Sequence, residues 1–244
     1  MHSLTDAHVH FGKRENFDEH LEFQTLKKEL KKNNIKKIFI FPISPTLENN
    51  LKMYNAIKDS THNFIPFLYL NPLETNSINE CEMLINDYHF KGIKLHPYVC
   101  KYRINHFKLL DPWMNIAMKY NCHIIVHCTS NDPYCSPSQL KELAQRYPQI
   151  TFQMAHMGAI WQCSEAIKII QETPNIYADS SIASFSAVSR ALKNISDNLL
   201  IGTDYPFYKF EMEQLKIRLA SPDEETLSKI LYKNFDKIID MHNY

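Results

Sequence analysis

The sequence of 244 residues contains only four glycines and no glycine-rich phosphate loop. Neither GxGxxG nor GxxxxGK[ST] occurs, which argues against the nucleotide-binding sites built on those motifs. The six cysteines form no CxxC pair, and with no export signal in view they are expected to be reduced thiols in a cytoplasmic protein. No apolar run of about 18 residues is present, so the sequence predicts no transmembrane helix.

The chain also lacks an excess of either charge, because 27 lysines and arginines balance 27 aspartates and glutamates. No overall field would therefore recruit nucleic acid or an anionic membrane, and neither is expected as a partner. The one basic cluster, residues 27–37, is interpreted as a solvated helix face. The length suits one large domain or two small ones.

Short runs rich in β-branched and aromatic residues recur along the whole chain and predict eight strands. These runs are residues 3–10, 36–43, 64–70, 91–96, 122–127, 150–156, 175–180 and 198–204. Stretches with helical periodicity separate most of them, namely residues 17–34, 77–89, 111–121, 136–148 and 163–173. Two further helical patterns follow the eighth strand, and the second of these opens at residues 221–224.

Ser136-Pro137 and Asp111-Pro112 each predict a helix start, with an N-cap followed by proline in the first turn. Strict alternation of strands and helices implies parallel strands joined by crossovers. Eight such units in about 250 residues predict a single (β/α)8 TIM barrel over residues 1–244. An open doubly wound sheet is the alternative, but its usual glycine-rich first turn is missing.

Polar side chains gather where the predicted strands end, and in a barrel these ends carry the catalytic residues. They are His8, His10, Lys94, His96, His127, His156, Asp179 and Asp204. Alternation along a strand points His8 and His10 to the same side, although an HxH pair alone is a weak motif. Several imidazoles and a carboxylate at one mouth form a nitrogen and oxygen ligand set suited to zinc, manganese or iron.

Six sequence segments resemble the metal-dependent amidohydrolase superfamily, and in particular the amidohydrolase-related branch that contains aminocarboxymuconate-semialdehyde decarboxylase. The segments, which lie within residues 5–207, are TDAHVHFG, GIKLHP, IIVHC, RYPQITFQMAHMG, NIYADSS and LLIGTDYPF. The terminal LYKNFDKII is a looser match, because Lys233 stands where a glycine often precedes the asparagine.

The resemblance implies a role for each matching residue. His8, His10 and His127 would bind the metal, and Asp204 would bind it or take the proton of its water. His156 would polarise the substrate or act as acid and base. In binuclear relatives a lysine at the position of Lys94 is carboxylated and bridges two metals. One divalent ion, zinc before manganese or iron, is the expectation here.

The expected reaction is hydrolysis, by metal-activated water, of a C–O or C–N bond next to a carbonyl in a small lactone, ester or amide. The alternative is non-oxidative decarboxylation or hydration of a small unsaturated or aromatic carboxylate on the same scaffold. A third reading is a non-enzymatic metal-binding barrel. Homodimers are common among such barrels. Residues proposed to contact the substrate are His96, Arg14, Tyr98, Arg103, Trp161 and Tyr205.

Overall fold

Each of eight strands pairs in parallel with the next along the chain, and together they form one continuous sheet. The computed structural model describes residues 4–13, 20–21 and 23–244. The parallel strands are β1 (Leu4–Lys13), β3 (Ile35–Pro42), β4 (Asn63–Tyr69), β5 (Gly92–Leu95), β6 (His123–Thr129), β7 (Phe152–Ala159), β8 (Ile176–Asp179) and β9 (Leu199–Leu200). A short strand, β2 (His20–Leu21), pairs antiparallel with the end of β1.

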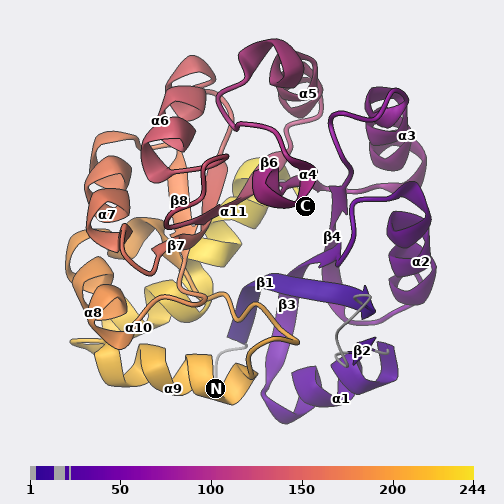
Figure 1. The fold of residues 1–244 in the computed structure, drawn as a ribbon. Coiled ribbons are helices and arrows are strands. Elements are labelled where there is room, and N and C mark those ends of the chain that lie inside the picture. The colour runs from indigo at the N-terminus through magenta and orange to yellow at the C-terminus, as the bar shows by residue number, and fades with distance from the viewer. Residues whose placement is uncertain (1–3, 14–19, 22) are drawn as a thin grey trace.

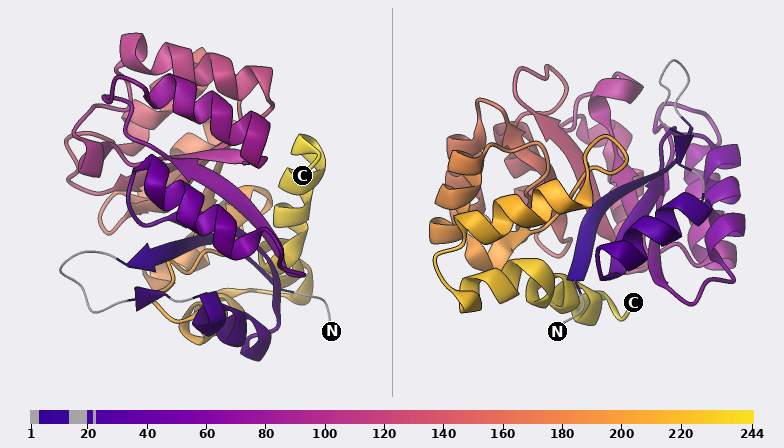
Figure 2. Two further views of the ribbon diagram at one scale, coloured as in Figure 1. Left: turned by 90° about the vertical axis from the view of Figure 1, so that its right-hand side faces the viewer. Right: turned by 90° about the horizontal axis from the view of Figure 1, so that it is seen from below.

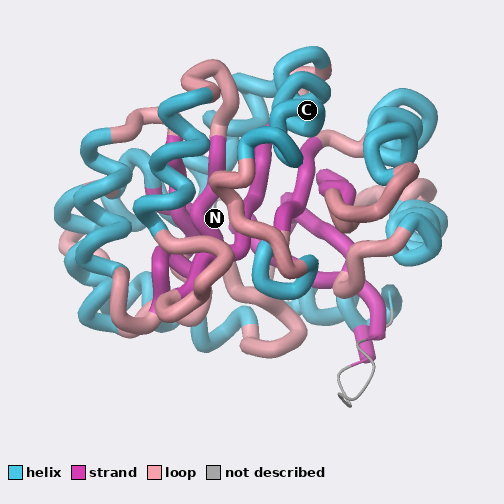
Figure 3. Tube along the Cα trace, turned by 45° about the horizontal axis from the view of Figure 1, so that its top comes forward, coloured by secondary structure: helices cyan, strands magenta, loops and turns pink. Residues whose placement is uncertain are grey.

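The sheet closes on itself between its first and last strands. The N–H of Ala7 donates to the carbonyl of Ile201 at 2.9 Å, and the N–H of His10 donates to the carbonyl of Tyr205 at 2.8 Å. Figures 1 and 3 show the resulting ring of strands with the helices outside it. The predicted (β/α)8 barrel is therefore confirmed.

The helices alternate with the strands around this ring (Figure 2). They are α1 (Phe23–Lys32), α2 (Leu47–Ile57), α3 (Ser77–Tyr88), α4 (Pro97–Cys100), α5 (Phe107–Lys119), α6 (Pro137–Arg146), α7 (Cys163–Glu172), α8 (Phe185–Asn194), α9 (Phe210–Ala220), α10 (Glu224–Ser228) and α11 (Asn234–His242). A 3-10 turn, η1 (Ser196–Asn198), and a π-helical turn, η2 (Lys229–Lys233), complete the set. Within the described ranges, no helix is long and apolar enough to cross a membrane.

The two predicted helix starts had different outcomes. Ser136 caps α6 through a capping box with Gln139, as expected. The start at Asp111-Pro112 is wrong, because α5 begins at Phe107 and includes Pro112. Pro112 stands in the second turn of α5, where its missing N–H removes one backbone hydrogen bond but does not end the helix. Asp111 binds Arg146 of α6 instead of capping its own helix.

The end of the barrel interior that faces α11 is filled mainly with apolar side chains from alternate strand positions. Phe39 and Phe67 pack inside the ring, and α11 covers that end, with Phe235 stacked on Phe39 at a ring-centroid distance of 4.2 Å. Gly92 makes room for this layer, because a Cβ there would lie 2.1 Å from the ring of Phe67. The pocket that contains the predicted site residues lies at the opposite end of the barrel.

A buried asparagine on α2 fixes the end of β4 beside the polar half of the barrel. The Asn50 side chain donates to the carbonyl of Tyr69 at 2.7 Å and accepts from its N–H at 2.9 Å. Tyr69 in turn pairs with Lys94 of β5. Asn50 thus holds the strand next to one of the predicted catalytic residues.

Asn50→Leu should lower the free energy of unfolding by about 2–4 kcal/mol, because two backbone groups of Tyr69 lose their bonds to the asparagine side chain. Urea denaturation measures this loss. Asn55→Leu on the exposed face of the same helix is the matched control and should change stability by no more than about 0.5 kcal/mol. Equal effects from the two substitutions would contradict the assigned role.

Glu213 of α9 anchors that helix to the end of β8. Its carboxylate accepts from the Ser180 hydroxyl at 2.5 Å and lies 2.8 Å from the Lys216 ammonium. Burial raises the pKa of Glu213 from 4.5 to about 7, although Lys216 and Ser180 oppose the shift. The folded protein therefore binds this proton more tightly than the unfolded chain does.

This raised pKa predicts a stabilising contribution that is complete below pH 4.5 and is lost as the pH rises to about 7. The loss amounts to at most ~3 kcal/mol. Thermal unfolding of the wild type and of Glu213→Gln across this range tests it, since the substitution removes the titrating group. A stability difference between the two proteins that stays constant with pH would refute the assignment.

Candidate metal centre

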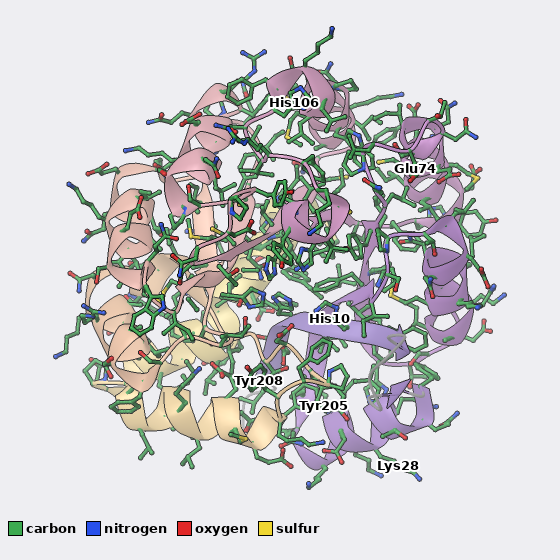
Figure 4. All side chains as sticks on the ribbon, viewed as in Figure 1. His10, Lys28, Glu74, His106, Tyr205 and Tyr208 are labelled. Carbon is green, nitrogen blue, oxygen red and sulfur yellow. The ribbon has the colours of Figure 1, made fainter. Side chains whose placement is uncertain are left out.

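Two histidines of β1 and an aspartate after β9 meet at the open end of the barrel. The Nε2 atoms of His8 and His10 lie 3.3 and 3.0 Å from Oδ1 of Asp204. All three residues are buried, and one ligand atom from each lies within 4.8 Å of the others. We call this set the His8–His10–Asp204 cluster. Figure 4 shows His10 close to the centre of the barrel.

The charge states of the cluster suit a cation. Burial lowers the pKa of His10 to about 4, so its imidazole is neutral at physiological pH. Burial also opposes ionisation of Asp204, but hydrogen bonds from His10 and His8 hold the pKa of Asp204 well below its usual range. Burial and Lys94 lower the pKa of His8, and Asp179 and Asp204 outweigh them and raise it. Two imidazoles and an ionised carboxylate are ligands that zinc, manganese and iron accept.

Lys94 of β5 lies beside this cluster rather than in it. Its Nζ is 3.4 Å from Nε2 of His8 and 4.4 Å from the ring centroid of Phe41. Burial lowers the pKa of Lys94 to about 8. A lysine in such surroundings can change protonation state near neutral pH, which acid–base chemistry requires.

The three remaining predicted histidines form a second group in the same pocket. His156 Nε2 lies 3.1 Å from His127 Nδ1, and the rings of His96 and His127 stack at 3.8 Å with 15° between their planes. Burial lowers the pKa of each of the three rings. His127 is not part of the His8–His10–Asp204 cluster, and its role as a metal ligand stays a prediction.

Asp179, at the end of β8, connects the two groups. Its Oδ2 accepts from His8 Nδ1 at 2.9 Å and from Gln153 Nε2 at 2.7 Å. Its Oδ1 accepts from the N–H of His156 at 3.1 Å and from both the N–H and the hydroxyl of Ser181. Although burial opposes ionisation, the charge of His8 and the hydrogen bonds hold the pKa of Asp179 far below its usual range.

The sequence pattern places Asp179 at a strand end but indicates no role for Asp179, Gln153 or Ser181. A glutamine inside an otherwise apolar strand was the one available signal for Gln153. Gly202 makes the contact between the strands feasible, because a Cβ there would lie 2.9 Å from Cβ of Asp179 and 3.0 Å from Cβ of His8. Asp179, Gln153 and Ser181 thus hydrogen-bond to the site histidines or to one another, and none of them lines the pocket.

The backbone at the end of β7 adopts an unusual conformation beside this network. His156 and Met157 have φ angles of +65° and +49°, and Gly158 follows at +65°. Left-handed backbone costs a non-glycine residue roughly 1–2 kcal/mol, so surrounding contacts must hold it. The hydrogen bond from the His156 N–H to Asp179 is one such contact.

A pocket of about 350 Å³ opens over these residues. Its polar floor consists of His10, Lys94, His96, His127, His156 and Asp204. Its wall is mainly apolar and comprises Ile43, Ser44, Pro45, Val99, Ile182, Phe207 and Tyr208. Figure 4 places Tyr208 near His10, on the segment that leads into α9.

The residues predicted to contact substrate have mixed positions. His96 lines the pocket, whereas Tyr98 and Trp161 are exposed outside its lining, Trp161 at 78%. Arg103 is exposed on the loop before α5. Tyr205 is buried against Phe210, with ring centroids 4.5 Å apart, and does not line the pocket. Arg14 lies outside the described residues, and substrate contact by all of these residues stays a prediction.

The sequence from residue 5 to residue 237 matches the family model described as Amidohydrolase. The chain belongs to this amidohydrolase family. Members of the family include hydrolases and decarboxylases. No curated protein sequence gives a significant match to this family member.

Solved structures share the fold at low sequence identity. The 5-carboxyvanillate decarboxylase of Sphingomonas paucimobilis has a TM-score of 0.77 at 11% identity, covering 98% of this chain and 99% of its own. A dihydroxybenzoic acid decarboxylase of Polaromonas with bound manganese has a TM-score of 0.74 at 13% identity. The match covers 99% of this chain and 98% of the decarboxylase. A candidate 2-pyrone-4,6-dicarboxylic acid hydrolase of Pseudomonas putida has a TM-score of 0.76 at 12% identity, and the match covers 99% of each chain.

The geometry predicts different outcomes for two pocket histidines in a zinc titration. His10→Ala should weaken zinc binding by more than about 100-fold, because it removes a member of the His8–His10–Asp204 cluster. His96→Ala, the matched control, should bind zinc within about threefold of the wild type, because His96 lies outside the cluster. Competition with a chelator measures both dissociation constants. Wild-type zinc affinity in His10→Ala would rule the cluster out as the metal centre.

Proposed function

We propose that this amidohydrolase is a zinc-dependent hydrolase that cleaves a C–O or C–N bond next to a carbonyl in a small lactone, ester or amide. The observation that carries the proposal is the His8–His10–Asp204 cluster, in which a buried ionised carboxylate and a neutral imidazole face one another at the floor of a pocket. Manganese and iron are the alternative ions, since the same donors accept them.

The donor set supports a single resident cation held by His8, His10 and Asp204, with His127 as the predicted fourth ligand. When bound, such an ion polarises a carbonyl and lowers the pKa of water to about 7. A second ion would need Lys94 to be carboxylated. We favour one ion, because Lys94 packs over Phe41 in a contact that suits an ammonium group.

The chain's own residues supply the remaining steps. Asp204 presents a carboxylate oxygen that is placed to accept a proton from the attacking water. Lys94 can donate a hydrogen bond to the carbonyl oxygen of the substrate, where negative charge develops. His156 lies on the pocket floor, where it can exchange a proton with the leaving group.

The pocket supports a small-molecule substrate. Its volume of about 350 Å³ is at the lower end of the range for ligand sites. The apolar wall, with Phe207 and Ile182, would exclude water from the bond that is cleaved.

Decarboxylation is the second candidate, and Lys94 is the observation that favours it. An ammonium group on the pocket floor, next to neutral imidazoles, can bind the carboxylate of a small unsaturated or aromatic acid. Two of the structural neighbours are named as decarboxylases of aromatic acids. The same metal ligands would serve either reaction.

Reactions in ¹⁸O-labelled water distinguish the two candidates. We expect the zinc-loaded protein to turn over a member of a panel of lactones, small amides and unsaturated carboxylates, with one solvent oxygen in the product. His127→Ala should lose zinc and at least about 100-fold in turnover, since a ligand is gone. Chelation should abolish turnover, and added zinc should restore it. Release of CO₂ together with an organic product that carries no ¹⁸O would establish the decarboxylase instead.

A further inference from the structure

We propose that Asp179 is a positioning residue that determines which nitrogen of His8, His156 and His127 carries the proton. The proposal rests on the function proposed above, because it concerns imidazoles that would hold or serve the cation. It assigns no direct contact with the metal or the substrate to Asp179.

The starting point is that an ionised carboxylate only accepts hydrogen bonds. Asp179 is fully buried, and its hydrogen-bond partners are Nδ1 of His8, Nε2 of Gln153, the backbone N–H groups of His156 and Ser181, and the hydroxyl of Ser181. Each of these atoms must therefore be the donor. This requirement fixes the direction of two chains of hydrogen bonds.

The first chain has one step and leads to His8. Because Nδ1 of His8 donates to Oδ2 of Asp179 at 2.9 Å, Nδ1 must carry a proton and cannot bind a cation. Nε2, which lies 3.3 Å from Asp204 Oδ1, is then the nitrogen that can give up its proton and offer a lone pair to a cation. The carboxylate thus turns Nε2 of His8, the nitrogen available to a cation, toward the His8–His10–Asp204 cluster.

The second chain has three steps and leads to His127. The Ser181 hydroxyl donates to Asp179, so its oxygen accepts from His156 Nδ1 at 2.7 Å. Nε2 of His156 then carries a lone pair and accepts from Nδ1 of His127 at 3.1 Å. This order leaves the lone pair of His127 on Nε2, where the Thr129 hydroxyl lies 3.4 Å away.

Gln153 keeps Asp179 in place for both chains. Its Nε2 donates to Asp179 at 2.7 Å and to the carbonyl of Ala7 at 3.0 Å. Its Oε1 accepts from Nε2 of His123 at 3.2 Å, which fixes the amide orientation. A single carboxylate of β8 therefore sets which ring nitrogen carries the proton in imidazoles that come from β1, β6 and β7.

Three substitutions distinguish the effect of each chain of hydrogen bonds from the effect of altering any buried carboxylate. Asp179→Asn replaces one carboxylate oxygen by an NH₂ group, which is a donor and cannot accept the hydrogen bonds that this oxygen accepts. Ser181→Ala interrupts only the chain to His156 and His127 and leaves the contact with His8. Asp6→Asn is the matched control, because Asp6 is also buried but accepts through one oxygen from the backbone N–H groups of His8 and Thr203.

The first readout is the zinc dissociation constant of the full-length protein, measured by chelator competition. Asp179→Asn should weaken zinc binding 10- to 100-fold, the usual effect of losing a carboxylate behind a ligating histidine. Asp6→Asn should stay within about threefold of the wild type, because an amide oxygen still accepts both N–H groups. Wild-type affinity in Asp179→Asn would overturn the proposal.

The second readout is the ¹⁵N NMR spectrum of labelled histidines, recorded with and without zinc. The wild type should show the proton on Nδ1 of His156 and His127 in both samples, and on Nδ1 of His8 when zinc is bound. Ser181→Ala should lose this pattern for His156 and His127 and keep it for His8. An unchanged pattern for His156 would also overturn the proposal. Failure of the wild type to bind zinc would refute the metal-dependent function, and the zinc-free spectra would still test the proton positions.

Discussion

A negative charge buried away from water must be surrounded by hydrogen-bond donors. At the pocket end of this barrel, the side chains and backbone groups around Asp179 meet that requirement. Its donors come from β1, β7 and the residues that follow β8. These segments are far apart in the sequence, and the carboxylate joins them through direct hydrogen bonds. The small Gly202 allows the close approach that this coupling needs.

The seam where the barrel closes is also where the metal centre lies. The N–H of Asp204 donates to the carbonyl of His8 at 2.9 Å, so the backbone bonds that join the last strand to the first hold two cluster residues together. The opposite half of the interior is an aromatic layer under α11. Inside the barrel, the aromatic side chains and the charged side chains therefore lie at opposite ends.

The sequence was sufficient to predict the barrel and the meeting of His8, His10 and Asp204. Both follow from periodicities and topology, because parallel strands bring their carboxyl ends to one side. The hydrogen-bond network of Asp179, Gln153 and Ser181 could not be predicted, since it depends on which atoms face one another across strands. The erroneous helix start at Asp111 has a related cause, because Arg146 of another helix competes for its carboxylate. Tyr205 shows the same limit: its side chain turns to pack on Phe210 rather than to line the pocket.

The pocket draws its floor and its wall from different parts of the fold. The floor residues stand on or just after strands, whereas Pro45, Val99, Ile182 and Tyr208 belong to four separate segments that follow strands. Substitutions in one of these segments can reshape the wall while the charged floor keeps its hydrogen bonds. Such a division allows one chemical apparatus to be fitted to new substrates by small local changes, so this scaffold is well suited to functional divergence.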